Sequence, residues 1–272
     1  MTHIMALCSS DGIRPASKMD FDKFQDLVDN GEGWVKQYNK QGVEVFTKPQ
    51  EGTAIRMVKI ETHFDDVSLD VLYDTLHDSE YRRTWDNVMI EEYGVCRLNP
   101  NCDVGYYAIK CPKPLRNRDF VFQRYWTKNH NNFMICNHSV QHKNAPIRRE
   151  YIRATSIISG YMGRTNGSSG CHFTYITQMD PKGSIPKWMV NKVATKTAPK
   201  VMANFAAAAR NYKGWKIKNN PHFKPWIRTE QNKLPLAKLE DFKSSPMLDE
   251  NLSRKLDSEA HALAAPHDDN SD

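Results

Sequence analysis

Apolar and polar side chains alternate with a period of two in segment after segment of this sequence, the pattern of a strand buried on one face. The alternation is clearest in residues 120–126 and 171–179. Short turn-forming stretches separate these segments, so the strands are expected to form one antiparallel sheet instead of parallel βαβ units. Nine strands are predicted, two within 33–48, joined by a turn at Asn39 to Gly42, and the others at about 54–63, 88–98, 103–110, 119–128, 132–140, 150–162 and 171–179.

Three helices are predicted around this sheet. Apolar residues at spacings of three and four indicate a short amphipathic helix over 21–30, and a second helix begins at a cap-like Asp66 or Ser68. The longest helical segment spans about 186–213, and Pro199 within it predicts a kink or a break just before that residue. Helices and an antiparallel sheet in one chain indicate an α+β fold.

The chain of 272 residues is expected to form one large domain over 20–231, with a flexible N-terminus over 1–19 and a disordered, acidic tail over 232–272. No apolar stretch approaches the ~20 residues of a membrane span. The first residues lack the pattern of a signal peptide, and the six cysteines form no CxxC pair, which favours a cytoplasmic protein with reduced thiols.

Charge is distributed unevenly along the chain. Residues 232–272 hold five Lys or Arg against nine Asp or Glu, a net charge of −4. Because the whole chain has a net charge of +6, residues 1–231 carry a net charge of +10. A basic body of this kind suits an anionic partner, either a nucleic acid or an acidic membrane surface.

The standard local signatures of catalysis are missing from the sequence. It contains no GxSxG, HExxH, GxxxxGK or GxGxxG motif. His138 and His142 lie four residues apart near a strand end, and Cys136 does not stand at a zinc-like spacing from them. We therefore expect neither an enzyme nor a metal site nor a cofactor.

Residues 77–86, HDSEYRRTWD, place Arg82 four positions before Asp86, so the two side chains can touch on a helix. One interpretation is a solvated ion pair. The other interpretation is a buried arginine that pairs with Asp86 and keeps further N–H donors for an anion. The order of the pair favours this second interpretation, because an ion pair with the basic residue first is the weaker arrangement on an isolated helix. The position of Arg82 and Asp86 around the helix does not distinguish the two interpretations, because polar Thr75 and Ser79 would lie on the same side of that helix.

Two basic segments are candidates for contact with phosphate groups at a membrane. The loop CPKPLRNRDF, residues 111–120, carries Lys113 and Arg116 and is either such a contact or a solvated turn. The long helical segment either only packs on the sheet or also presents a basic amphipathic face, and both can hold at once. Its candidate membrane contacts are Lys187, Trp188, Lys192, Lys196 and Lys200.

Taken together, YRRTWD (81–86), GYYAIKCPKPLRNRDFV (105–121) and DPKGSIPKWMVNK (180–192) resemble the START (StAR-related lipid transfer) domain family, in the group that includes the phosphatidylcholine transfer protein. NPHFKPW (220–226) is similar to the segment after the last helix in one phospholipid-transfer member. The resemblance runs over roughly 20–230 in matching order. It implies a helix-grip fold, in which a long curved antiparallel sheet surrounds a lipid tunnel and a C-terminal helix forms the lid.

The resemblance also implies a headgroup site. Arg82 would contact the lipid phosphate while Asp86 braces it inside the tunnel. Three aromatic residues surround the choline in a phosphatidylcholine-binding member, and two of those places fall on Tyr107 and Phe120. The third falls near Ile157, which has no aromatic face, so a ligand that is phosphatidylcholine, phosphatidylethanolamine or both is expected.

The function implied is binding of one phospholipid and its transfer between membranes by a cytoplasmic monomer that associates peripherally with anionic membrane. A lipid-gated adaptor would need the same cavity and is the alternative. An RNA-binding sheet, suggested by Tyr106 and Phe122, lacks a glycine-flanked signature, and an enzyme acting on lipid lacks a legible nucleophile and base. The acidic tail is expected to compete for the basic face, and phosphorylation would strengthen this competition. Its candidate phosphorylation sites are Ser253, Ser258 and Ser271.

Overall fold

The computed structural model describes residues 13–167, 170–183 and 197–242. The helices are α1 (Lys18–Asp29), α2 (Leu69–His77), α3 (Ser79–Trp85) and α5 (Ala198–Lys218), with short 3₁₀ turns η2 (Thr229–Gln231) and η3 (Leu239–Phe242). The strands are β1 (Val35–Lys40), β2 (Val43–Gln50), β3 (Thr53–Phe64), β4 (Met89–Asn99), β5 (Cys102–Ile109), β6 (Arg118–Lys128), β7 (Asn132–Ser139), β8 (Ile152–Arg153), β9 (Thr155–Thr165) and β10 (Cys171–Asp180).

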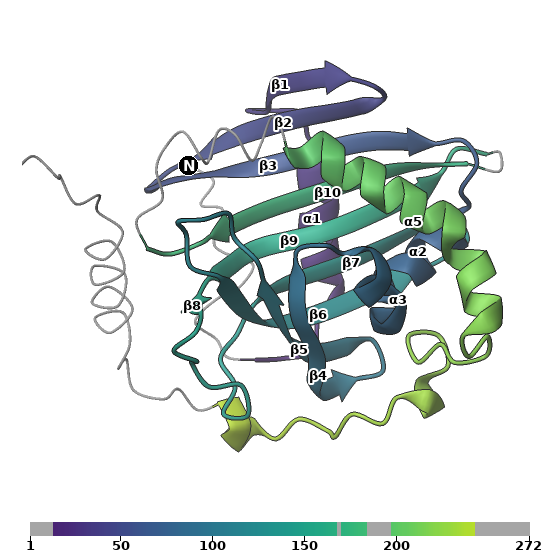
Figure 1. Ribbon diagram of the computed structural model, residues 1–272. Helices are drawn as coiled ribbons and strands as arrows, with labels where there is room; N and C mark the ends of the chain where they lie inside the picture. Colours follow the sequence, from purple (N-terminus) through teal and green to yellow (C-terminus); the bar gives the residue numbers. More distant parts are fainter. Residues whose placement is uncertain (1–12, 168–169, 184–196, 243–272) are drawn as a thin grey trace, which may run out of the picture.

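One long sheet organises these elements. Its strand order is β1-β2-β3-β10-β9-β7-β6-β5-β4, and every neighbouring pair is antiparallel. The short β8 pairs in parallel with β6. Figure 1 shows α2, α3 and α5 across one face of the curved sheet and α1 behind the other face. The predicted α+β class with a long antiparallel sheet is confirmed.

Each face of the sheet carries its own apolar core, as period-two strands require. On the face of α2 and α5, Phe133 and Phe173 pack with residues such as Phe205 of α5. On the opposite face, Phe24 of α1 lies against the backbone of Gly160, where an added Cβ would come within 2.5 Å of its ring. Helix α1 can therefore lie close to β9 only because residue 160 lacks a side chain.

The structure describes residues 13–19 of the N-terminus that the sequence predicted to be flexible. Helix α1 begins at Lys18, and residues just before it are held in place. Arg14 forms two hydrogen bonds to Asp20, of 2.7 and 2.8 Å, and Ser17 donates its backbone N–H to the same carboxylate at 2.7 Å. The hydrogen bond from Arg14 is the main reason why the pKa of Asp20 is lowered. Residues 1–12 lie outside the described part of the chain.

Helix α5 starts at Ala198 and continues to Lys218, five residues beyond its predicted end. Pro199 stands in its first turn, where the missing N–H needs no intrahelical acceptor. Helix formation over 186–196 cannot be compared, because residues 184–196 lie outside the described ranges. No helix in the described ranges is both long and apolar enough to cross a membrane.

The structure describes residues 232–242, the first part of the segment that the sequence predicted to be disordered, and some of them contact the sheet. The backbone of Arg97 on the edge strand β4 donates to Pro235 and accepts from Ala237, both at 2.8 Å. Leu234 packs directly on Gly94, where no side chain stands in its way. We call residues 219–242 the C-terminal strap, which Figure 1 shows running past β4. A few anchoring contacts are enough to place this polar segment, while 243–272 lie beyond the described residues.

Candidate functional site

Helix α3 carries the arginine that the sequence singled out. The helix is a separate element that begins after Asp78, whose side chain accepts the Tyr81 N–H at 3.1 Å. The Tyr81 hydroxyl donates to the carbonyl of Ala208 on α5 at 2.7 Å. Helix α3 is thus fixed to α5 on the inner face of the sheet, and the Arg82 guanidinium turns back to donate to the Leu76 carbonyl at 2.8 Å.

Two carboxylates flank Arg82. Its Nη1 lies 3.9 Å from Asp86 Oδ2, and its Nε lies 3.8 Å from Glu92 Oε2 on β4. The three side chains are 15%, 11% and 12% exposed, so the pair that the spacing predicted is largely buried and includes a second acid. Burial opposes the charged form of Arg82, yet its pKa is raised, because Glu92 foremost and Asp86 among others stabilise the cation.

Tyr107 fixes the position of Asp86. Its hydroxyl donates to Asp86 Oδ2 at 2.6 Å, and burial, assisted by that carboxylate, raises the pKa of Tyr107. Tyr107 on β5 is the cross-strand partner of both Glu92 on β4 and Phe120 on β6. Cross-strand partners share a face of a sheet, so these side chains lie on the inner face with Arg82.

Several polar atoms around Arg82 are buried without a hydrogen-bond partner among the described residues. They are Arg82 Nε, Glu92 Oε2 and Trp85 Nε1, and the Arg82 guanidinium lies 5.6 Å from the centre of the Trp85 ring. Leaving such a group unsatisfied costs about 1–3 kcal/mol, and more for a charged group. A cluster of unsatisfied donors and acceptors in one place is what a site for a polar ligand requires.

Two tyrosines of the central strands extend this polar region. Tyr161 on β9 and Tyr175 on β10 stack with ring centres 4.8 Å apart, and the Arg82 side chain interacts with the Tyr161 hydroxyl. Burial raises the pKa of both phenols, so both remain hydrogen-bond donors. Next to them, the hydroxyl groups of Ser159 and Thr177 form a hydrogen bond with their oxygens 2.6 Å apart.

The three positions that the resemblance assigned to a choline cage do not share one local environment in the structure. Tyr107 and Phe120 are direct cross-strand neighbours, and Phe120 is buried. Ile157 is the extra residue of β9 where the pairing with β10 shifts between Ser156 and Ile158, and it is half-buried. The structure therefore brings two aromatic rings together and places an aliphatic side chain at the irregular position.

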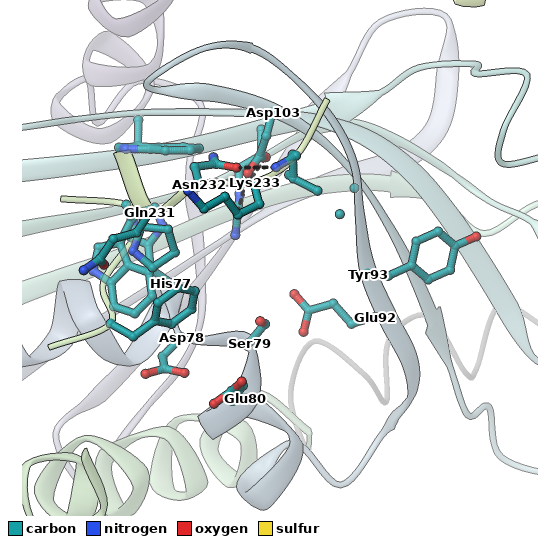
Figure 2. Close-up of a pocket in the computed structure, with 18 of the residues that line it drawn as sticks. His77, Asp78, Ser79, Glu80, Glu92, Tyr93, Asp103, Gln231, Asn232 and Lys233 are labelled. Atoms are coloured by element: carbon teal, nitrogen blue, oxygen red, sulfur yellow. Dashed lines mark hydrogen bonds and ion pairs between the residues drawn. The ribbon is translucent and has the colours of Figure 1, made fainter. Parts of the chain in front are cut away.

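A cavity of about 480 Å³ adjoins this cluster, between the start of α3, strands β4 to β6 and the C-terminal strap. Figure 2 shows the Glu92 carboxylate directed toward Ser79 within it, with Gln231 to Lys233 of the strap along another side. Arg124 in its wall is bound to Asp103 through two hydrogen bonds, of 3.1 and 2.7 Å. Glu92 thus has Arg82 on one side and open space on the other.

The predicted membrane contacts are described only in part. Lys113 in the 110–117 loop and Lys200 on α5 are exposed. Arg116 is half-buried, and its guanidinium donates to the carbonyls of Arg149 and Tyr151, so it holds the loop against the turn that precedes β8. The remaining predicted residues lie outside the described ranges: Lys187, Trp188, Lys192 and Lys196, and the candidate phosphorylation sites Ser253, Ser258 and Ser271.

Sequence reasoning missed Glu92 and Tyr161. Strand alternation could not tell whether Glu91 or Glu92 faces inward, because the pairing of β4 with β5 shifts between Met89 and Glu91. Tyr175 lies on the alternating face that the sequence showed clearly, and its stacking partner Tyr161 is its cross-strand neighbour. Pairing β9 with β10 would have been the available signal.

Comparisons with known proteins agree on one family. The START domain pattern matches residues 17–214. The chain is 40% identical over 232 residues to START domain-containing protein 10 of Mus musculus and of Homo sapiens, which covers 85% of this chain and 80% of each relative. It is 25% identical over 191 residues to the phosphatidylcholine transfer protein of Bos taurus, with 68% of this chain and 87% of that protein covered.

Solved structures show the same relationship. The crystal structure of human STARD10 matches with a TM-score of 0.82 at 38% identity, over 88% of this chain and 98% of that one. Human StAR-related lipid transfer protein 5 matches with a TM-score of 0.64 over 71% of this chain and 94% of that one, and at 16% identity it shows a shared fold alone.

Proposed function

The chain belongs to the START domain family, and from this premise we propose that it binds one phospholipid within the curved sheet and transfers it between membranes. The family membership confirms the resemblance seen in the sequence. The observation that carries the proposal is the largely buried Arg82, held between Asp86 and Glu92 with its Nε unsatisfied, beside an apolar inner face.

The inner face suits acyl chains. Between the sheet and α5 it is lined by apolar side chains such as Phe64, Phe173 and Phe205, which contact one another. At ~0.8 kcal/mol per buried methylene, exposing two acyl chains of about thirty methylenes to water costs on the order of 20 kcal/mol. A protein that shelters these chains can therefore speed exchange between membranes without any chemical step.

The cluster around Arg82 suits a phosphodiester. A phosphate oxygen accepts short, charge-assisted hydrogen bonds from a guanidinium, which would use the donors that Arg82 and Trp85 leave unsatisfied. Tyr161 supplies a neighbouring hydroxyl, whereas the Tyr107 hydroxyl is already donated to Asp86. Asp86 braces the arginine while Tyr107 fixes Asp86, so the cation is oriented before the ligand arrives.

In this proposal the protein is a cytoplasmic monomer without catalytic activity. Its basic part docks on anionic membrane through exposed lysines such as Lys113 and Lys200, and α5 moves to admit the lipid. The relatives named as transfer proteins support the absence of a reaction. A lipid-gated adaptor would use the same site and would differ in showing no net transfer between vesicles.

Native mass spectrometry of the purified protein, with lipid extraction from the same sample, tests the proposal. We expect one diacyl phospholipid per chain, and we expect lipid-loaded protein to carry fluorescent phospholipid from donor to acceptor vesicles. A preparation that stays empty after incubation with phosphatidylcholine and phosphatidylethanolamine vesicles, or that holds only sterol, would refute it. Loading without transfer would favour the adaptor.

A further inference from the structure

The cluster around Arg82 holds one more negative than positive charge. Arg82 is the single cation between Asp86 and Glu92, and all three side chains are largely buried. Arg124, a partly buried cation in the wall of the adjoining cavity, is committed to Asp103 through two hydrogen bonds. A bound phosphate would draw on the charge of Arg82 and leave one carboxylate without its counter-charge, which a buried site tolerates poorly.

Hydrogen bonding identifies Glu92 as the carboxylate left over. Asp86 already accepts the Tyr107 hydroxyl at 2.6 Å and the Val88 backbone N–H at 3.3 Å. Glu92 Oε2 is buried and accepts no hydrogen bond from any described residue; it forms an ion pair with Arg82 Nε at 3.8 Å, too long for a hydrogen bond. The same residue lines the cavity beside α3, so a ligand group has space to reach it.

We infer that Glu92 selects phospholipids whose headgroup amine carries N–H groups, the ethanolamine type, over those whose amine is fully methylated, the choline type. This rests on the proposed function, since it assigns a role within the same lipid site. Two methylenes separate phosphate from amine in both headgroups, so a phosphate on Arg82 brings the amine within reach of Glu92.

The two headgroups differ in what they can offer a carboxylate. A primary ammonium donates charge-assisted hydrogen bonds, which would satisfy Glu92 Oε2 and restore the missing positive charge. A trimethylammonium has no N–H and depends on surrounding aromatic faces. At the three cage positions only Tyr107 and Phe120 supply rings, because Ile157 is aliphatic. The site therefore offers more to the amine that can donate.

The first test compares Glu92→Gln with Glu91→Gln after incubation with vesicles of equimolar dioleoyl phosphatidylethanolamine and phosphatidylcholine. Glu91 is the matched control, because it faces away from the site and pairs with Arg148 at 2.6 Å. We expect native mass spectrometry to show phosphatidylethanolamine enriched on the wild type and on Glu91→Gln. In Glu92→Gln the bound ratio should shift about tenfold toward phosphatidylcholine, as expected when one charged hydrogen bond is lost.

A Glu92→Gln protein that loads lipid at the wild-type ratio would overturn the inference and leave the proposed function intact. A wild type that loads no phospholipid would instead overturn the proposed function. These two failures are therefore distinguishable in one experiment.

A second test needs no variant and so does not depend on Glu92→Gln folding. The wild type is offered phosphatidylethanolamine, its N-methyl and N,N-dimethyl derivatives and phosphatidylcholine, in pairwise competition. All four carry the same charge, so the series isolates the N–H group. We expect the largest loss of relative affinity, about tenfold, at the last methylation, which removes the final N–H. Equal affinity across the series would overturn the inference.

Discussion

At the scale of single residues, Arg82 keeps its charge in a largely buried position because Asp86 and Glu92 lie on either side. We predict that Arg82→Ala abolishes phospholipid loading while the protein stays folded. Loading is measured by native mass spectrometry, and folding by circular dichroism. Arg56→Ala is the control, because Arg56 is an exposed arginine on β3 that does not line the cavity. Full loading of Arg82→Ala would exclude Arg82 as the phosphate ligand.

A second prediction at this scale concerns pH. Burial lowers the pKa of His138 to about 4, whereas in the unfolded chain it is near 6.5. The unfolded state thus binds a proton first as pH falls, and the free energy of unfolding should drop by about 3 kcal/mol between pH 7 and pH 4 on account of this residue.

Denaturant unfolding at several pH values checks this. His138→Asn should remove that part of the pH dependence, while His130→Asn, at an exposed loop position, should leave it unchanged. Buried His77 also has a lowered pKa, so a smaller slope of the same sign should persist in His138→Asn. An unaltered slope in His138→Asn would contradict the assignment.

At the scale of elements, α5 is anchored to the rest of the site near its C-terminal end. Lys216 and Asp78 form a buried pair at 2.8 Å, and Tyr212 donates to the same carboxylate at 3.1 Å. Asp74 next to this pair accepts the Trp226 indole N–H of the strap at 2.8 Å. This end of α5 is therefore held from two sides.

We predict that Lys216→Met lowers the free energy of unfolding by about 3 kcal/mol, because it leaves Asp78 buried without its cation. The control is Lys18→Met, since Lys18 and Asp22 form an exposed pair on α1 and its loss should cost less than ~0.5 kcal/mol. Guanidinium unfolding measures both. Similar values for the two variants would show that the buried pair adds nothing.

Close packing of α1 against β9 gives another prediction at this scale. Gly160→Ala should destabilise the protein by about 1–3 kcal/mol, because the new methyl group would overlap the Phe24 ring. Gly214→Ala on α5 has nothing within 4 Å of its added methyl and should stabilise by ~0.5–1 kcal/mol through helix propensity. Thermal unfolding of the two variants measures both changes in stability. Destabilisation in both variants would mean that backbone strain, and not the contact with the Phe24 ring, explains the loss of stability in Gly160→Ala.

At the scale of the whole molecule, charge is divided between a basic part and an acidic end. Residues 243–272 hold three Lys or Arg and seven Asp or Glu, a net charge of −4, against +10 for residues 1–242. We predict that deleting 243–272 increases binding to anionic vesicles, because it removes negative charge that competes for the basic face. The deletion begins after residue 242, since residues 234–237 contact β4 and Asp241 and Phe242 contact Lys143 and His142. Vesicle co-sedimentation at low and physiological salt measures the change, and equal binding of both forms would reject the competition.

The sequence by itself determined the elements and half of the site. Period-two patterns placed every long strand within a few residues, and a four-residue spacing paired Arg82 with Asp86. Both signals are local, because a strand face and a helix face are set by residues close together in the chain.

Only the tertiary structure decided what surrounds that pair. Shifting a strand by one residue moves each side chain to the other face, so the irregular pairing at the start of β4 settled that Glu92 points inward and Glu91 outward. The anchor of α5 joins Lys216 to Asp78 across 138 residues, and the strap joins Trp226 to Asp74 across 152. Contacts at such separations depend on how the whole chain packs, and no local pattern encodes them.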